Sequence, residues 1–267
     1  MASASATTSP DVLGRHFADL RAAGRRALVV YVTAGHPDVA GSLELLRGLD
    51  DAGADVIEVG VPFSDPMADG AVIQASSQRA LEQGMTLDRT LDLVARARVR
   101  APVVLFSYLN PLLTRRAELL DRAAEAGVHG VLVTDLPVGA DPELEAWLGG
   151  GPLAFVRLVA PTTPRARMAE IARHGRGFVY LISRLGVTGD RGELSDELPA
   201  TVAALRQATS LPICVGFGIS RPEQAAAVGR LADGVVVGSA VVRAADRDVD
   251  AALSLVRAMR ASLDELS

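Results

Sequence analysis

The sequence predicts an α/β protein with a (β/α)8 TIM-barrel fold, and three observations support that prediction. Eight short apolar runs rich in β-branched residues alternate with longer amphipathic segments of Ala, Leu, Arg and Glu, a pattern typical of a parallel sheet covered by helices. Eight such units in roughly 250 residues are typical of a closed barrel. A Gly-x-Gly-x-x-Gly turn is missing after the first run, which leaves a doubly wound open sheet as the second choice.

The elements are predicted from the starts of the apolar runs and from the turns between them. Residues 10–23 are expected to form an extra N-terminal helix that caps the barrel floor. Glycines at 52–55 and 126–129 suit the left-handed residue that ends a helix before the next strand. Ser220 with Glu223 fits a capping box that opens the helix after the seventh strand. The strands are expected to begin near Leu28, Asp55, Pro102, Val128, Pro152, Gly177, Pro212 and Asp233.

Two long loops interrupt the regular order. The loop after the second strand, at 62–86, is expected to carry an extra helix over 74–83. The loop after the sixth strand, at 184–197, is polar and Gly-rich, as is typical of a mobile lid. Residues 1–10 lack the apolar core of a secretory signal, so we expect a disordered lead-in to a single barrel domain over 11–267.

The composition narrows the class of protein. The chain has 267 residues, of which 49% are hydrophobic and 4% aromatic, and its net charge is −5. An acidic balance without a basic run argues against a nucleic-acid partner. No apolar run suggests a membrane span, and a cytoplasmic location is the default expectation. The single cysteine, Cys214, lies in an apolar stretch and is expected to be a buried hydrophobic residue.

The absence of lysine limits the chemistry. All 27 basic residues are arginines, so a lysine Schiff base and a phosphate-loop lysine are both excluded. The four histidines show no spacing typical of a metal motif, and we expect no metal site. Carboxylates and tyrosines are therefore the chief candidates for acid–base chemistry.

The segment from Glu58 to Gly70 carries the strongest functional signal, because carboxylates end a buried strand and follow it on a loop. Strand alternation gives Glu58 the parity of Val56, so a barrel that buries Val56 inside also places Glu58 inside, near the top. Desolvation there raises the pKa of a carboxyl, whereas pairing with an arginine is the alternative. Asp69 lies on a loop long enough to fold back over the same opening, or it caps the next helix.

Other polar groups at the same end of the predicted barrel are more ambiguous. Tyr180, in the sixth strand, needs a hydrogen-bond partner for its hydroxyl, and the pattern leaves core packing and substrate contact equally open. Thr188 offers a hydroxyl on the predicted lid with the same two interpretations.

A phosphate site is predicted after the seventh and eighth strands. Gly218 follows one of these strands, and Gly238 with Ser239 follows the other. Glycines let an anion approach the backbone, and the free N–H groups where a helix starts attract it. These two loops frequently bind phosphate in this fold. Gly189, on the predicted lid, is placed to close over such an anion.

These segments, taken together from about residue 12 onward, resemble the α subunit of tryptophan synthase. The 58–70 block is highly specific, and all the blocks occur in the family's order. The matching blocks are YVTAG (31–35), EVGVPFSDPMADG (58–70), SYLNP (107–111), DLP (135–137), YLISRLGVTG (180–189), GFGIS (216–220) and GS (238–239).

The resemblance implies a (β/α)8 lyase that splits indole-3-glycerol phosphate into indole and glyceraldehyde 3-phosphate. It implies that Glu58 shuttles protons at the glycerol side and that Asp69 accepts the indole N–H and stabilises the positive intermediate. It assigns Tyr31, Tyr180 and Thr188 to the substrate pocket. It assigns the phosphate site to Gly189, Gly218, Gly238 and Ser239.

The resemblance also implies a partner. The family's α subunit docks on a pyridoxal-phosphate-dependent β subunit in an αββα heterotetramer, and indole passes to that subunit to make tryptophan. No cofactor is expected in this chain itself. The contacting face is expected to include Asp65, Pro66, Asn110 and Pro137.

Other functions remain open at this point. A standalone indole-3-glycerol-phosphate lyase has the same site. A phosphosugar isomerase or another phosphate-binding barrel predicts a base late in the chain and gives Asp69 no role. A docking subunit without activity is disfavoured by the intact Glu58 and Asp69.

Overall fold

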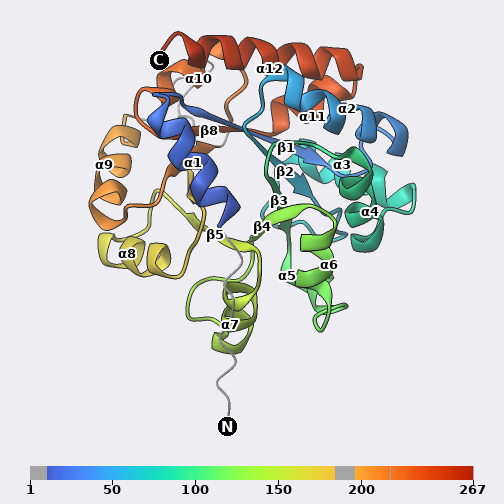
Figure 1. The fold of residues 1–267 in the computed structure, drawn as a ribbon, viewed down its shortest axis with the longest axis horizontal. Helices are drawn as coiled ribbons and strands as arrows, with labels where there is room; N and C mark the ends of the chain where they lie inside the picture. The colour runs from blue at the N-terminus through green and yellow to red at the C-terminus, as the bar shows by residue number, and fades with distance from the viewer. Residues whose placement is uncertain (1–10, 184–195, 217, 267) are drawn as a thin grey trace.

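The computed structural model describes residues 11–183, 196–216 and 218–266, and within them eight parallel strands form a closed barrel (Figure 1). Each strand pairs with its neighbour in chain order, and β8 closes the barrel against β1. The predicted (β/α)8 fold is therefore confirmed, and the open sheet is excluded. We call the end where the strands finish the mouth and the opposite end the floor.

The strands begin within two residues of their predicted starts, because each one is a short and mostly apolar run. Their bounds are β1 Ala27–Thr33, β2 Val56–Gly60, β3 Val103–Ser107, β4 Val128–Val133, β5 Ala154–Val159, β6 Val179–Ile182, β7 Ile213–Gly216 and β8 Gly234–Val237.

Helices surround the barrel. Their bounds are α1 Val12–Ala22, α2 Val39–Ala52, α3 Ala71–Glu82, α4 Leu87–Ala97, α5 Leu109–Leu113, α6 Leu119–Glu125, α7 Pro142–Gly150, α8 Arg165–Arg173, α9 Leu198–Ala208, α10 Pro222–Gly229, α11 Ser239–Ala245 and α12 Val249–Asp264. No helix in the described part of the chain is both long and apolar enough to cross a membrane.

Side-chain alternation along the strands produces two apolar layers. One layer fills the barrel interior and includes Val29, Val56 and Val104. The other layer lies between the barrel and its helices and includes Val30 and Ile57. Because successive residues of a strand point to opposite faces, this partition fixes which polar side chains point into the barrel.

Helix α1 caps the floor, as predicted, and crosses the barrel end that faces the viewer in Figure 1. Its buried residues Leu13, Phe17 and Leu20 belong to the same apolar cluster as the barrel interior. The rings of Phe17 and Phe178 lie 5.3 Å apart. The floor is thereby sealed with apolar side chains, which leaves the mouth as the end open to chemistry.

One helix start differs from the prediction. Helix α10 begins at Pro222, so its cap residue is Arg221 rather than Ser220. The side chain that caps it belongs to Gln224, whose Oε1 accepts from the N–H groups of Ser220 (2.9 Å) and Arg221 (3.1 Å). Proline suits the first helical position, so the helix starts one residue later than predicted. The capping side chain is therefore that of Gln224 and not that of Glu223.

Candidate active site

Glu58 lies inside the barrel, as strand parity predicts. It shares the parity of Val56, which is in the interior layer, and it pairs in register between Tyr31 and Val104. Its side chain is 1% exposed, and its Oε1 has no hydrogen-bond partner. Burial raises the pKa of Glu58 to about 8, and no described arginine opposes this shift. The carboxyl is therefore largely protonated at neutral pH.

Asp69 lies on the loop between β2 and α3 and is half-buried. The loop is held by a hydrogen bond from the Asp69 N–H to the Pro66 carbonyl (3.1 Å) and by one from Gln74 Nε2 to the Asp69 carbonyl (2.9 Å). The cap residue of α3 is Gly70, without a side-chain cap, so the side chain of Asp69 does not cap this helix. Burial raises the pKa of Asp69 to about 6, in part offset by a hydrogen bond from Tyr108.

Tyr108 is a site residue that the analysis of the sequence did not single out. It directly follows β3 and is 4% exposed. Its hydroxyl accepts from the Ala68 N–H (2.9 Å) and is hydrogen-bonded to Asp69, while its ring lies 5.0 Å from that of Phe63. Burial raises the pKa of Tyr108 to about 12, so it stays a donor. Its position at the end of a barrel strand is the signal that identifies it.

Tyr31 lies beside both carboxylates. Burial raises the pKa of its phenol, and the negative charges of Asp69 and Glu58 raise it further. Its ring meets that of Phe106 edge-on, with 5.2 Å between centroids. A Cβ on Gly60 would overlap the Tyr31 hydroxyl, so glycine is required at that position. Glu58, Asp69 and Tyr31 are thus gathered at the mouth.

Tyr180 lies on β6 and points into the barrel, where it packs against the interior layer. Burial raises the pKa of its phenol, and the charge of Glu58 adds to the shift. A Cβ on Gly216 would overlap the Tyr180 hydroxyl, so the smallest residue is needed there. Tyr180 therefore combines a packing role with a place next to Glu58.

The predicted phosphate residues lie where β7 and β8 end at the mouth. Gly218 is exposed and has a φ of +78°, which favours glycine. Gly238 is the cap residue of α11, and Ser239 is the first residue of that helix. A Cβ on Gly238 would lie 3.3 Å from the Cβ of Tyr31, which places this helix start beside Tyr31. Thr188 and Gly189 lie outside the described residues.

The residues expected to contact a partner follow β2, β3 and β4 on one side of the mouth. Asp65, Asn110 and Pro137 are exposed, and Pro66 is half-buried. Two large apolar side chains are exposed nearby: Met67, on the loop after β2, at 89%, and Leu113, the last residue of α5, at 39%. Exposed apolar groups within a polar rim are typical of a protein interface.

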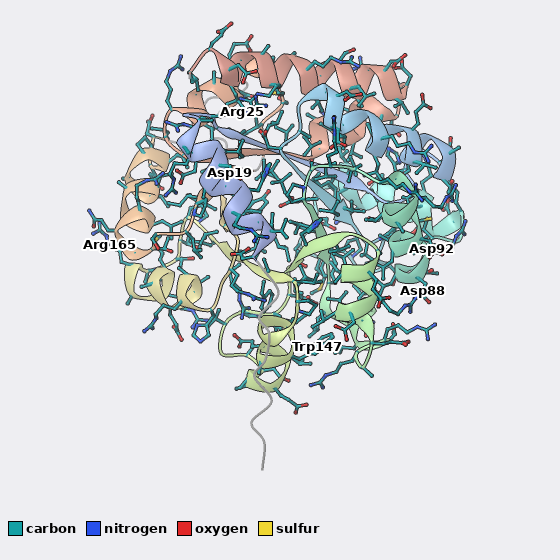
Figure 2. All side chains as sticks on the ribbon, in the orientation of Figure 1. Asp19, Arg25, Asp88, Asp92, Trp147 and Arg165 are labelled. Atoms are coloured by element: carbon teal, nitrogen blue, oxygen red, sulfur yellow. The ribbon has the colours of Figure 1, made fainter. Side chains whose placement is uncertain are left out.

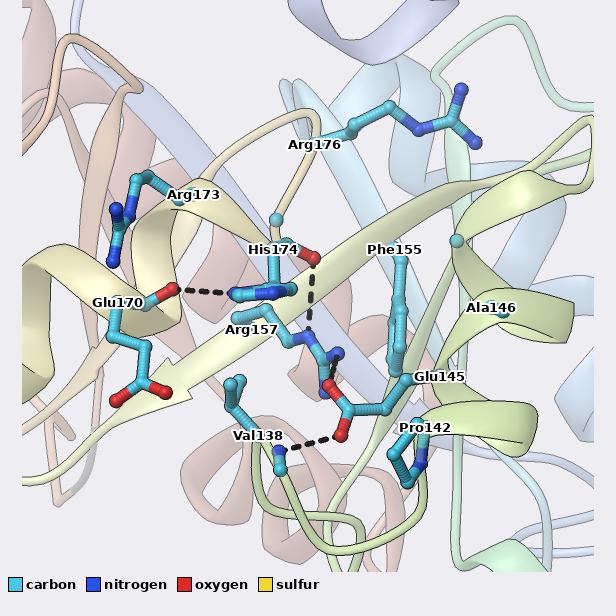
Figure 3. Close-up of a pocket in the computed structure, with 13 residues that line it drawn as sticks. Val138, Pro142, Glu145, Ala146, Phe155, Arg157, Glu170, Arg173, His174 and Arg176 are labelled. Atoms are coloured by element: carbon cyan, nitrogen blue, oxygen red, sulfur yellow. Dashed lines mark hydrogen bonds and ion pairs between the residues drawn. The ribbon is translucent and has the colours of Figure 1, made fainter.

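A cavity of about 500 Å³ lies elsewhere, on the outer side of β5 between α7 and α8 (Figure 3). Its lining contains Phe155 and the ion pair between Arg157 Nη2 and Glu145 Oε2 (2.7 Å). Arg157 also donates to the carbonyls of Leu136 and His174, at 3.2 Å each, and stacks on the Phe155 ring. These bonds join β5 to the neighbouring loops, and the cavity contains no predicted site residue.

Metal ligands do not cluster in this site. Across residues 11–183, 196–216 and 218–266, no group of three His, Cys, Asp or Glu side chains is arranged to hold a metal ion. Cys214 is buried in the barrel interior, as expected for a hydrophobic residue, and burial raises the pKa of its thiol.

Comparison with known proteins gives consistent results. Residues 17–267 match the family model described as tryptophan synthase alpha chain. A tryptophan synthase alpha chain from Geobacter sulfurreducens is 48% identical over 234 residues, which cover 86% of this chain and 89% of that protein. The alpha chain from Citrifermentans bemidjiense is 50% identical over 230 residues, covering 85% and 86%.

Solved structures agree in fold. A chain of Mycobacterium tuberculosis tryptophan synthase superposes with a TM-score of 0.86 and 34% identity, covering 94% of this chain and 98% of that one. The tryptophan synthase alpha subunit of Legionella pneumophila gives a TM-score of 0.85 and 34% identity, covering 95% and 98%.

Proposed function

This chain belongs to the tryptophan synthase alpha chain family, and from that membership we infer that it is a carbon–carbon lyase of tryptophan biosynthesis. It cleaves indole-3-glycerol phosphate to indole and glyceraldehyde 3-phosphate. The isomerase and the inactive docking subunit are not favoured by any feature of the site.

We propose that Glu58 is the proton shuttle. In its protonated form it gives a proton to indole C3, which makes the ring an electron sink. The resulting carboxylate then takes the proton of the glycerol hydroxyl next to the bond that breaks, as the bond's electrons return to the ring. The first proton stays on C3 of the released indole, the second comes from the hydroxyl that becomes the aldehyde, and Glu58 ends protonated as it began. The raised pKa of Glu58, about 8, supports this role because it keeps the proton available at neutral pH.

We propose that Asp69 acts as the anion. Its carboxylate accepts the indole N–H and stabilises the positive charge that develops on the ring after C3 is protonated. A pKa of about 6 supports this role, because Asp69 is largely ionised at pH 7 while Glu58 is not. Pairs of carboxyls whose environments separate their pKa values are typical of divided acid–base roles. The hydrogen bond from Tyr108 orients the Asp69 carboxylate.

We propose that the substrate lies between these carboxyls and the ends of β7 and β8. Tyr31 and Tyr180 flank its reacting part, beside Glu58. Gly218, Gly238 and Ser239 bind the phosphate with backbone N–H groups and a hydroxyl. Thr188 and Gly189 belong to the same proposed site on the ground of the family resemblance alone.

The partner is the tryptophan synthase beta subunit, and we propose an αββα assembly. The contact face contains Asp65, Pro66, Asn110 and Pro137. The exposed side chains of Met67 and Leu113 support this face, because a partner would cover them. We propose that pyridoxal phosphate belongs to the beta subunit, that this chain uses no cofactor or metal of its own, and that the enzyme is cytoplasmic.

The observation that carries the proposal is the buried carboxyl of Glu58 with an unpaired oxygen at the mouth of the barrel. The test is an assay of indole release from indole-3-glycerol phosphate, with the chain alone and with a tryptophan synthase beta subunit. We expect slow release by the chain alone and a large increase in the complex. No indole under either condition would overturn the proposed reaction, and indole without any effect of the beta subunit would favour a standalone lyase.

A further inference from the structure

Two parts of the proposed site that are far apart in the sequence are joined directly. Helix α3 begins two residues after Asp69, and helix α11 begins at the proposed phosphate-binding Ser239. Ile73 of α3 and Val242 of α11 form a small buried apolar cluster with Tyr31. The relative position of α3 and α11 therefore determines how far the carboxylate end lies from the phosphate end.

A polar clasp spans the same two helices near their other ends. Arg79 of α3 places Nη1 2.7 Å from Asp246 Oδ1, and Asp246 directly follows α11. The same carboxylate oxygen lies 3.4 Å from Nε2 of His36, on the loop after β1. Arg79, Asp246 and His36 thus connect α3, α11 and β1 through one oxygen atom.

The buried histidine gives the clasp a defined geometry. His36 is 3% exposed, and its Nε2 also lies 3.4 Å from the Val242 carbonyl. Both neighbours of Nε2 are acceptors, so this nitrogen carries the hydrogen. The other ring nitrogen, Nδ1, is buried without a partner in the described structure. Among the described residues, the polar partners of the ring are Asp246 and the Val242 carbonyl, and both belong to the α11 segment.

A second bond fixes α3 one turn away from Arg79. The hydroxyls of Thr33, at the end of β1, and Ser76, on α3, lie 2.7 Å apart. Ser76 also donates to the Ile73 carbonyl, at 2.8 Å. Helix α3 is thus attached to β1 at Ser76 and to the end of α11 at Arg79.

We propose that Arg79, Asp246 and His36 are positioning residues that hold α3 against α11 and so set the separation between Asp69 and the phosphate site. This proposal rests on the proposed function. None of the three residues acts on the substrate itself. A bound substrate is held at both ends, so a small shift between them misaligns its reacting atoms, and small misplacements strongly lower turnover. The clasp therefore acts on kcat more than on substrate affinity.

The test uses the full chain with its beta subunit and measures kcat and KM for indole formation. We expect Asp246→Asn and Arg79→Ala each to lower kcat roughly tenfold, with KM changed less than about threefold. Arg79→Lys should retain most of the activity, because it keeps a cation within reach of Asp246. The control is Arg100→Ala. Like Arg79, Arg100 is an exposed arginine paired with aspartate, here Asp51 (2.9 Å) and Asp50 (3.6 Å) at the floor, and its loss should leave kcat unchanged.

Two results would overturn the proposal that the clasp positions the site. One is a normal kcat in both variants; the other is a loss of kcat that Arg100→Ala reproduces. A purely structural role would lower the melting temperature and leave kcat unchanged well below it. Amide hydrogen exchange of α3 gives a second readout, independent of the reaction. We expect faster exchange in α3 for Asp246→Asn, with α12 unchanged, and equal exchange in α3 would contradict the proposal even if the wild-type chain released no indole.

Discussion

Asp55 at the floor of the barrel and Glu58 inside it are three positions apart, and both carboxyls are buried, at 7% and 1% exposure. Asp55 is fully partnered. It accepts from the Leu28 N–H (2.8 Å), from Arg260 (2.9 Å) and from Arg25 (3.3 Å), and Arg25 lies just after α1, toward α12, in Figure 2. By contrast, one carboxyl oxygen of Glu58 has no hydrogen-bond partner, and no arginine among the described residues pairs with Glu58.

The two carboxyls therefore suit different roles: the paired Asp55 a structural one, and the unpaired Glu58 a chemical one. Buried carboxylates that are paired hold elements together, and here Asp55 joins the C-terminal helix α12 to the floor through Arg260. A buried carboxyl without a partner destabilises the fold, and such groups cluster where a perturbed pKa is useful. The buried carboxyl at the floor is paired and stabilises the fold, whereas the unpaired carboxyl at the mouth is the one to which we assign a chemical role.

The largest expected effect is the loss of activity in Glu58→Gln. Glu58 is the proposed donor of the proton to indole C3 and the proposed acceptor of the hydroxyl proton, so removing its carboxyl should lower kcat by about a thousandfold. Substrate binding should stay measurable, because the amide has nearly the same shape. Indole release is the measurement, and Glu44→Gln, the same change at an exposed position on α2, is the control. Activity within tenfold of wild type would remove Glu58 from the proposed role.

The matching change at the floor should affect stability and not chemistry. Asp55→Asn removes the buried charge partner of Arg260 and leaves it only the half-exposed Asp264, at 2.8 Å. Breaking a buried ion pair costs about 3–5 kcal/mol. Denaturant unfolding should report that loss, while kcat at a temperature well below unfolding stays close to wild type. A loss of less than about 1 kcal/mol would show that the floor is not the stabilising region.

The sequence alone predicts much of this barrel. Each strand is a short and mostly apolar run, so its start is predicted within two residues. The parity of Glu58 with Val56 predicts that Glu58 points inward. The contrast between Asp55 and Glu58 is not predictable in this way. It depends on Arg260, which is more than 200 positions from both residues and is brought to Asp55 by the closure of the barrel.

The same limit applies to the polar contacts at the mouth. Tyr108 and Asp69 belong to different loops, and only the fold shows that they are hydrogen-bonded. Similarly, Arg79 and Asp246 are brought together by the packing of α3 on α11. Local patterns predict which strand carries a group, and tertiary contacts decide whether that group is paired.

The third prediction is that Glu58→Gln stabilises the protein. A carboxyl whose pKa is raised from 4.5 to about 8 on folding contributes stability below pH 4.5 that is lost as the pH rises to about 8. At pH 7 the loss is on the order of 3 kcal/mol, and glutamine, which does not ionise, avoids it. Denaturant unfolding at pH 5 and pH 8 should show a larger gain at pH 8. If Glu58→Gln destabilised the protein at pH 8, the result would show that the ionised Glu58 carboxylate has a partner in the folded chain.

The smallest expected effect is on the pH dependence of kcat/KM. The proposed mechanism requires ionised Asp69 and protonated Glu58, so kcat/KM should rise as the pH increases to about 6 and fall above about 8. Each limb should change activity about tenfold per pH unit. A phosphate ester also titrates near pH 6, so the acidic limb needs a control.

Tyr108→Phe provides that control. The hydrogen bond from Tyr108 lowers the pKa of Asp69, and its removal should move the acidic limb to higher pH. A limb that arises from the substrate phosphate would not move. If the acidic limb does not move in Tyr108→Phe, ionisation of Asp69 is not the cause of that limb.

Direct titration of the Glu58 carboxyl tests the contrast between floor and mouth most directly. Carbon-13 NMR of the labelled glutamate carboxyls, with the Glu58 signal identified by its absence in Glu58→Gln, measures the ionisation in the folded chain. We predict a midpoint near pH 8. A midpoint near 4.5 would show that Glu58 is charged and partnered like Asp55, and it would contradict the proposed source of the proton.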